Sequence, residues 1–384
     1  MAWDFPVLTK PEKIPPLELN RLFMGFVLCL LIIVFMGAVY YYLTQDKNSF
    51  LYSLILGLFS FVLFGMAVGW KILRVGMLMK NNEVIEINNR KAEGVCCKWA
   101  SEYISIVDFS FVFPDEIEIG QFSRGGEYNA IGNRAIIFSE TSDYIAIFHD
   151  LLCSLRYKLL GLSHAGKLEV NMYVPEVLSL SLWRSFSLAW SELNLPEGEV
   201  INPVFIGNNF VMQVDEWLQH PGDKYRLVVV CNPLSPEDTQ TLTSDGACAW
   251  LLAPAGVTEQ LPQKGRLYRA LNTDSTTLHS DLSTLLKYQE GGMEIERLWF
   301  NNISDKNIVN KIAQVCGETG PRLISHFFTE LVLGRQGGGG IWMTMVLALL
   351  NNKGENTGSL IVSRCNAETL FVQVKDTSLQ KEVL

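Results

Sequence analysis

The chain of 384 residues is poor in charge and lacks paired cysteines and clustered metal ligands. Charged residues make up 18% of it, against roughly 25% in an average soluble chain. None of the eight cysteines forms a C-x-x-C pair, which argues against a disulfide framework and indicates reduced, cytosolic thiols. The five histidines are scattered along the chain. We therefore expect neither a metal site nor a cofactor.

Positive charge is also scarce over most of the sequence. Residues 1–80 hold seven Lys/Arg and four Asp/Glu, a net charge of +3, and the remaining residues hold 24 and 36, a net charge of −12. Nucleic acid requires a basic surface on its protein partner. The acidic balance therefore excludes nucleic acid as a partner, and it argues against a domain lying flat on anionic lipid.

Two stretches near the N-terminus contain no charge at all. They are residues 22–43 and 50–70, and each matches the ~20 residues that a helix needs to cross about 30 Å of hydrocarbon. Only a helix satisfies its own backbone hydrogen bonds in lipid. The six-residue link between the stretches then forces an antiparallel transmembrane hairpin over residues 22–70.

The flanking charges predict the orientation of this hairpin. Three basic residues precede the first span and three follow the second, whereas Lys47 in the connecting loop is offset by Asp46. The positive-inside rule places both termini in the cytoplasm, with residues 1–21 as a cytoplasmic tail. We expect a bacterial inner membrane. Gly65-x-x-x-Gly69 matches a helix-packing motif, which fits packing within the hairpin or a homodimer.

From residue 81 onward, short apolar runs alternate with turn signals. The pattern predicts strands at 102–113, 167–174, 226–231 and 248–254, helices at 177–193 and 305–315, and a C-terminal hairpin at 359–374. Strands alternating with helices indicate an α/β fold with a mixed or parallel sheet. We expect a linker at 71–98 and a cytoplasmic domain at 99–384, with the turn-rich 194–225 region as a candidate boundary between two halves.

Four segments in the second half of the chain occur in the order and spacing of a known family. They are RLVVVCNPLSPED, SDGACAWLLAP, RLWFNNISDKN and LGRQGGGGIWMTMVLALL, which fall within about residues 225–350. This part of the chain resembles the C-terminal part of ketosynthases. The resemblance implies a thiolase-like mixed α/β domain behind the transmembrane hairpin.

The departures from this family concern its catalytic residues. Ketosynthases use a cysteine nucleophile at a helix N-terminus and two histidines that stabilise developing negative charge. Asn301 or Asn302 stands where the first histidine is expected, and Arg335 stands at the second position. No cysteine flanked by small residues begins a helix at the appropriate place. Cys153 lies in the leucine-rich pattern HDLLCSLR, which predicts a buried thiol. The resemblance therefore implies a catalytically inactive relative.

A run of glycines surrounds the second of these positions. Gly334 precedes Arg335, and Gly337, Gly338, Gly339 and Gly340 lead into an apolar helix. The run lacks the G-K-[ST] ending of a phosphate-binding loop. We expect it to let the following helix pack closely against the sheet.

Three functions are consistent with this sequence. The first is a membrane-anchored, non-enzymatic adaptor, chaperone or immunity-type partner of another protein, such as a secreted effector. This arrangement resembles accessory proteins of bacterial secretion systems, including type VI systems. The second is a membrane-bound acyl-transfer enzyme of the thiolase superfamily, and the third is a scaffold subunit of an envelope complex.

Overall fold

The computed structural model describes most of the chain and divides it into two compact units. Described are residues 3, 5–45, 48–114, 138, 143–164, 167–195, 204–205, 209–232, 243–254, 262–303, 305–319, 325–334, 336–351, 358–365 and 368–377. One unit comprises residues 5–95, and the other comprises residues 1–4 with 96–384.

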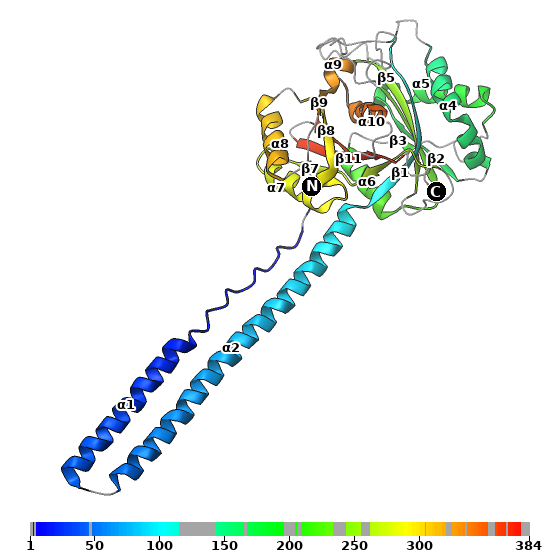
Figure 1. Ribbon diagram of the computed structural model, residues 1–384. Coiled ribbons are helices and arrows are strands. Elements are labelled where there is room, and N and C mark those ends of the chain that lie inside the picture. The colour runs from blue at the N-terminus through cyan, green and yellow to red at the C-terminus, as the bar shows by residue number, and fades with distance from the viewer. Residues whose placement is uncertain are drawn as a thin grey trace. The chain divides into compact units, whose positions relative to one another are not determined.

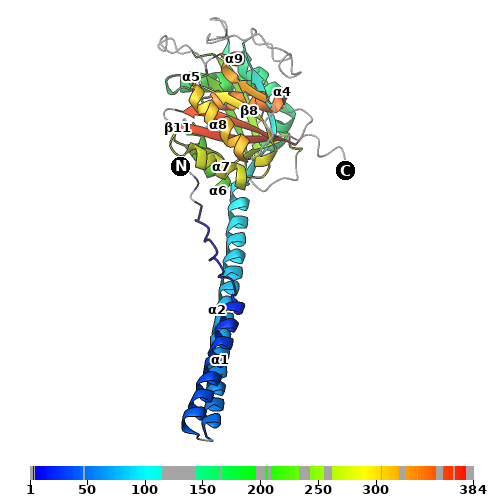
Figure 2. The same ribbon diagram turned by 60° about the vertical axis from the view of Figure 1, so that its left-hand side comes forward.

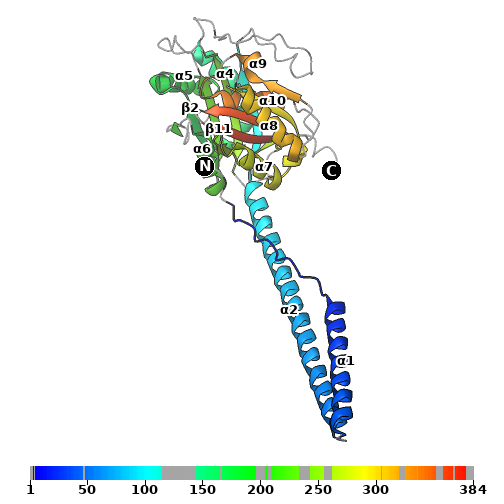
Figure 3. The same ribbon diagram turned by 90° about the vertical axis from the view of Figure 1, so that its left-hand side faces the viewer.

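The unit of residues 5–95 is built on two apolar helices, which confirms the predicted helical pair. Helix α1 spans Leu19–Thr44 and helix α2 spans Ser49–Ala100. Both are long and apolar enough to cross a membrane, with mean hydropathy of 2.9 and 2.2 over their most apolar windows. Helix α1 runs beside the N-terminal part of α2 (Figures 1, 2 and 3).

Helix α2 continues through the segment expected to be a linker. It holds 52 residues without interruption, which corresponds to a length of about 78 Å at 1.5 Å per residue. No proline occurs between Pro16 and Pro114, so no residue in this range lacks the backbone N–H that helix propagation requires. Residues 71–98 are therefore a helical stalk.

Aromatic and small residues hold the two helices of this unit together. Phe26 stacks on Phe64 with ring centroids 4.3 Å apart, and it also contacts Phe61. Gly37 packs so closely on Ser53 that a Cβ atom would overlap its side chain. In the motif Gly65-x-x-x-Gly69, a Cβ atom added to either glycine would meet no heavy atom within 4 Å. These glycines therefore do not mediate close packing of the two helices of the hairpin, contrary to that expectation.

Among its described residues, the second unit contains one mixed sheet of eleven strands in the order β3-β2-β4-β5-β1-β6-β11-β10-β8-β9, with β7 paired to β11. The strands are β1 Tyr103–Val112, β2 Leu168–Tyr173, β3 Val204–Phe205, β4 Tyr225–Asn232, β5 Gly246–Ala253, β6 Gly265–Tyr268, β7 Leu271–Thr273, β8 Ile295–Asn301, β9 Ser325–Phe328, β10 Gly358–Cys365 and β11 Glu368–Asp376. The helices are α4 Tyr144–His164, α5 Ser179–Glu192, α6 Phe210–Gln219, α7 Leu278–Tyr288, α8 Lys306–Thr319, α9 Thr329–Leu333 and α10 Gly340–Asn351, with 3-10 turns at Glu176–Leu178 and Gly292–Glu294. These elements confirm the α/β class, the expected strands and the C-terminal hairpin.

The strand order repeats itself within this sheet. In the first half β2 pairs parallel with β3 and β4, and β5 pairs antiparallel with β4 and β1. In the second half β8 pairs parallel with β9 and β10, and β11 pairs antiparallel with β10 and β6. The antiparallel pair β1·β6 joins the halves. The boundary between them lies between β5 and β6, so the turn-rich 194–225 region falls inside the first half.

Helices lie on both outer faces of the sheet and between its halves. Helices α4 and α5 pack on one face of the first half, and α7 and α8 pack on one face of the second (Figure 1). Helices α6 and α10 share a third core with residues from strands of both halves. The unit therefore has five layers, because each half presents one apolar face outward and one toward the central helices.

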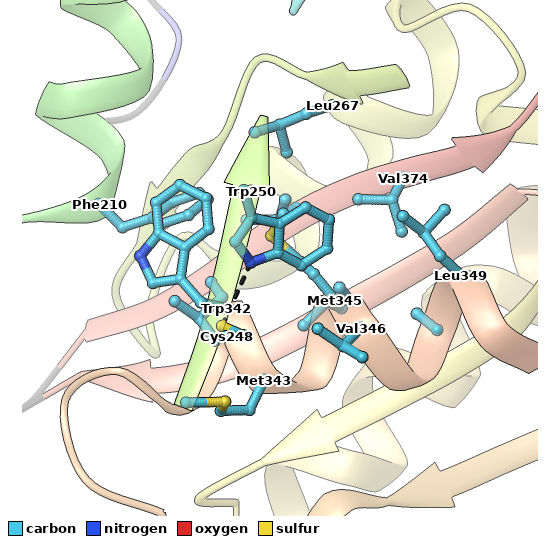
Figure 4. Packing of buried hydrophobic residues seen from close by; sticks show 14 of the residues in the cluster. Phe210, Cys248, Trp250, Leu267, Trp342, Met343, Met345, Val346, Leu349 and Val374 are labelled. Carbon is cyan, nitrogen blue, oxygen red and sulfur yellow. Dashed lines mark hydrogen bonds between the residues drawn. The ribbon is translucent and has the colours of Figure 1, made fainter. Parts of the chain in front are cut away.

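Trp342 lies at the centre of this middle layer (Figure 4). Its ring contacts Phe210 of α6 at 4.9 Å in an edge-to-face arrangement and Trp250 of β5 at 6.1 Å. It belongs to α10, the helix predicted after the glycine run, in which every residue before Asn351 is buried. An apolar helix without a polar face requires this position inside a protein core.

The last turn of helix α2 belongs to the second unit, and buried polar side chains of that unit bind its carbonyls. The Nε of Arg269, which is fully buried, donates to the Trp99 carbonyl at 3.2 Å, and its guanidinium lies 4.0 Å from the Trp99 ring. Gln289 Nε2 donates to the Ala100 carbonyl at 3.1 Å. Carbonyls in a last helical turn have no intrahelical partner, so these donors terminate α2.

Candidate functional site

The strands β2, β4 and β8 end beside the glycine-rich turn that leads into α10. Three glycines of this turn lie where a Cβ atom would not fit. A Cβ on Gly337 would overlap the Asn232 side chain at the end of β4, and one on Gly339 would lie 2.8 Å from Val230 Cγ1. A Cβ on Gly340 would lie 3.0 Å from the Asn301 amide nitrogen at the end of β8. Close packing of the helix on the sheet is thus the role of this run.

Carboxamide side chains gather around this turn. Asn302 Nδ2 donates to the Gln336 carbonyl at 2.9 Å, and Asn301 Nδ2 donates to Ser363 Oγ at 3.1 Å. Gln336 Nε2 donates to the Leu333 carbonyl at 2.9 Å. Asn302 also has φ of +56°, in the left-handed region that asparagine tolerates better than most residues. We call Asn232, Asn301, Asn302 and Gln336 the amide cluster.

Three buried atoms of the amide cluster have no hydrogen-bond partner among the residues described. They are Asn232 Nδ2, Asn301 Oδ1 and Asn302 Oδ1. Asn301 is only 1% exposed, and a buried polar atom without a partner costs free energy of roughly 1–3 kcal/mol. The cluster therefore retains unused hydrogen-bonding capacity.

The structure brings together part of the set predicted from the sequence. Asn301, Asn302 and Gly340 lie around the same turn as Gly337 and Gly339. The Gly334 residue at φ +67° is buried and its carbonyl accepts from Gln336, whereas Gly338 is exposed. Arg335 lies outside the described residues.

Sequence reasoning missed Asn232 and Gln336. Asn232 directly follows the apolar run of β4, and polar residues at strand ends are common at ligand sites of α/β folds. That position was a usable signal. Gln336 stands inside the glycine-rich segment, where only the folded turn reveals that its carbonyl accepts from Asn302.

The amide cluster can form hydrogen bonds but has no group suited to proton transfer. Asparagine and glutamine carboxamides donate and accept hydrogen bonds without titrating. General acid–base catalysis requires a group with a pKa near the working pH. Within the described part of the chain, the carboxamides around this turn therefore offer binding and packing, not acid–base chemistry.

The central helices also lack a cysteine at their starts. Helix α6 follows Asn209, whose Oδ1 accepts from the Met212 backbone N–H at 3.2 Å, and α10 follows Gly339. Burial raises the pKa of the Cys248 and Cys316 thiols to about 12, so both stay protonated. Cys153 is exposed on α4, which corrects the expectation of a buried thiol because it lies on the outer side of that helix.

No cluster of three or more potential metal ligands occurs among the residues that the structure describes. The candidate site holds carboxamides and glycines in place of such ligands.

The fold, but not the sequence, matches known proteins. No family model matches the chain, and no curated protein matches it significantly. A solved complex of a type II polyketide synthase acyl-carrier protein with its ketosynthase is 11% identical, with a TM-score of 0.50, over 72% of this chain and 100% of that one.

Two further solved structures are similar at lower scores. One is 3-oxoacyl-[acyl-carrier-protein] synthase III from Aquifex aeolicus VF5, with 13% identity and a TM-score of 0.42 over 71% of this chain and 99% of that one. The other is cerulenin-bound OleA from Xanthomonas campestris, with 11% identity and a TM-score of 0.44 over 73% and 98%.

None of these comparisons supports the expected resemblance to type VI accessory proteins, which stays a prediction. The mixed α/β unit, with its repeated halves and two central helices, has a thiolase-like fold, and the chain carries two apolar N-terminal helices before it.

Proposed function

We propose that this chain is a catalytically inactive, membrane-anchored member of the thiolase-like fold that acts by binding another protein. The amide cluster carries the proposal. Asn301 or Asn302 occupies the position at which the sequence resemblance places a catalytic histidine, and both residues pack against the turn before α10. An enzyme fold that loses its catalytic groups keeps its core and its surfaces, which remain available for binding.

The membrane location is part of this proposal. The apolar helices α1 and α2 support an anchor, and the basic flanks of residues 22–70 support a bacterial inner membrane with both termini in the cytoplasm. A secreted effector is one class of protein that such an anchored partner would bind. The anchor would then hold a binding surface beside the membrane.

Acyl transfer is tested directly with acetyl-CoA and palmitoyl-CoA. We expect the intact mass of the detergent-solubilised chain to stay unchanged after incubation with either thioester, because burial raises the pKa of the Cys231, Cys248 and Cys316 thiols and so keeps them protonated. Replacement of the two exposed cysteines, Cys29 and Cys153, by serine serves as the control for adventitious labelling. An acyl adduct that persists in this variant and disappears when the remaining cysteines are also replaced would contradict the proposal and support an acyl-transfer enzyme.

Binding is tested by exchanging the anchor. A foreign two-helix hairpin in place of residues 19–70 should still yield the partner that co-purifies in stoichiometric amount with the wild-type chain. Loss of that partner on exchange would indicate that the hairpin makes the contacts, as in a scaffold subunit. Absence of any stoichiometric partner of the wild-type chain in its native membrane would contradict the proposal.

A further inference from the structure

Two asparagines of the helical stalk bind the backbone of the N-terminal segment. Asn89 Nδ2 donates to the Thr9 carbonyl at 2.8 Å, and its Oδ1 accepts from the Thr9 N–H at 3.3 Å. Asn82 forms the same pair with Glu12, at 2.8 Å and 3.0 Å. Each carboxamide thus satisfies the donor and the acceptor of one residue. We call Asn82 and Asn89 the asparagine ladder.

The spacing of the ladder matches the spacing of its ligand. Asn82 and Asn89 are seven residues apart, which places them on one side of the helix about 10.5 Å from each other along its axis. Thr9 and Glu12 are three residues apart, and three residues of polyproline II advance about 9 Å and return to the same side. Two turns of the helix and three residues of the extended chain therefore advance by similar distances. The extended chain runs antiparallel to α2 (Figure 2).

The N-terminal segment is suited to such binding. Residues 5–18 form neither helix nor strand and contain Pro6, Pro11, Pro15 and Pro16. Proline restricts the chain to extended conformations before binding, which lowers the entropy lost on ordering. Pro11 and Ile14 also line a hollow of about 260 Å³ beside the ladder, together with Met79 of α2.

The contacts of the ladder select backbone, not side chains. All four hydrogen bonds end on main-chain atoms of Thr9 and Glu12. A ligand of the ladder must be an extended segment that presents a backbone N–H at every third residue. Proline at position 9 or 12 would remove one of these N–H groups.

We propose that the asparagine ladder is a binding site for an extended, proline-containing peptide backbone, and that residues 9–12 of this chain are its resident ligand. Residues 45–48 already connect α1 to α2 in the sequence at one end. The ladder closes the other end, because the segment that it holds leads directly into α1. Helix α1 is thus prevented from sliding along α2.

The sequence supplies a matched control for this site. Asn81 and Asn88 precede the ladder residues by one position and are also seven residues apart, but both are exposed. Asn81→Ala with Asn88→Ala changes the composition and helix propensity of α2 as much as Asn82→Ala with Asn89→Ala does. Circular dichroism should show equal helix content in both double variants.

Hydrogen exchange of the full chain in detergent measures the proposed contacts. In the Asn82→Ala, Asn89→Ala variant, the Thr9 and Glu12 amides should exchange faster by about tenfold or more, since each loses its acceptor. Trypsin should also cleave after Lys13 several-fold faster, while the Asn81→Ala, Asn88→Ala variant should behave as wild type. Equal exchange and cleavage in the two double variants would overturn the proposal.

Proline substitution tests the ligand side of the contact. Thr9→Pro removes an N–H that donates to the ladder, whereas Lys10→Pro removes one for which the described contacts show no acceptor. Both changes keep an extended backbone. Cleavage after Lys13 should accelerate only in Thr9→Pro, and equal rates in the two variants would show that the ladder does not hold the backbone.

Discussion

Helices α6 and α10 occupy equivalent places in the two halves of the sheet but meet different surroundings. Each follows the edge strand of its half and precedes the strand that pairs parallel within it. Helix α6 has ten residues and leaves Met212 68% exposed, whereas α10 has twelve and buries all but Asn351. The same topology thus accommodates one amphipathic and one fully apolar helix.

The difference lies in how each helix begins. Asn209 caps α6 with its side chain, while α10 begins in a glycine turn pressed against the ends of β4 and β8. A side-chain cap such as that of Asn209 requires space at the first turn of the helix. At the start of α10 the ends of the strands occupy this space, so glycine stands there. The amide cluster forms at α10 because residues from both halves, Asn232 and Asn301, meet the beginning of this helix.

The largest effect expected from this comparison is that of emptying the core around α10. Trp342→Ala should reduce the free energy of unfolding by about 3–5 kcal/mol, because it leaves a cavity among Phe210, Trp217 and Trp250. Met212→Ala on the exposed side of α6 should change it by at most about 0.5 kcal/mol. Urea unfolding of the detergent-solubilised variants measures both. Similar losses would show that the two helices are equally buried.

A smaller loss is expected from filling the turn before α10. Gly339→Ala should destabilise the unit by about 1–3 kcal/mol, since its Cβ would lie 2.8 Å from Val230 Cγ1. Gly317→Ala in α8 meets nothing within 4 Å, and should be neutral or stabilising by up to about 1 kcal/mol. Thermal unfolding of the two variants separates close packing from glycine flexibility. A stable Gly339→Ala protein would contradict the packing role.

The smallest effect concerns the start of α6. Asn209→Ala should cost about 1 kcal/mol of unfolding free energy, because the Met212 N–H loses its capping acceptor. Asn209→Asp should restore most of the stability, since a carboxylate also accepts this hydrogen bond. Chemical unfolding of the pair tests the contrast, and an unchanged Asn209→Ala protein would mean that water replaces the cap.

Much of the fold could be predicted from the sequence because its signals are local. The apolar runs of β4 and β5 identified strands buried on both faces, and the glycine run identified the start of α10. The repeated halves could not be predicted, since the strand order depends on pairing between segments far apart in the chain, such as β1 with β6. Pairing at that separation leaves no periodic trace in either strand.

The candidate site was predicted only in part for the same reason. Asn301 and Asn302 stood out through a resemblance in their neighbouring residues, but Asn232 lies about seventy positions earlier in the sequence. Its contact with Gly337 arises only when β4 and α10 pack together. The helical stalk, in contrast, depends on consecutive residues alone. The absence of proline over 17–113 already permits the helix that continues through residues 71–98.

The sequence by itself determined that this chain carries two uncharged, membrane-length helices before an acidic α/β unit, because length, charge and periodicity are properties of consecutive residues. Only the tertiary structure decided which polar residues meet. It brought Asn232 beside Gly337, and Asn82 and Asn89 beside Thr9 and Glu12. Such contacts depend on which segments, far apart in the sequence, pack against each other. A carboxamide both donates and accepts, so it forms hydrogen bonds with whichever backbone groups this packing brings beside it.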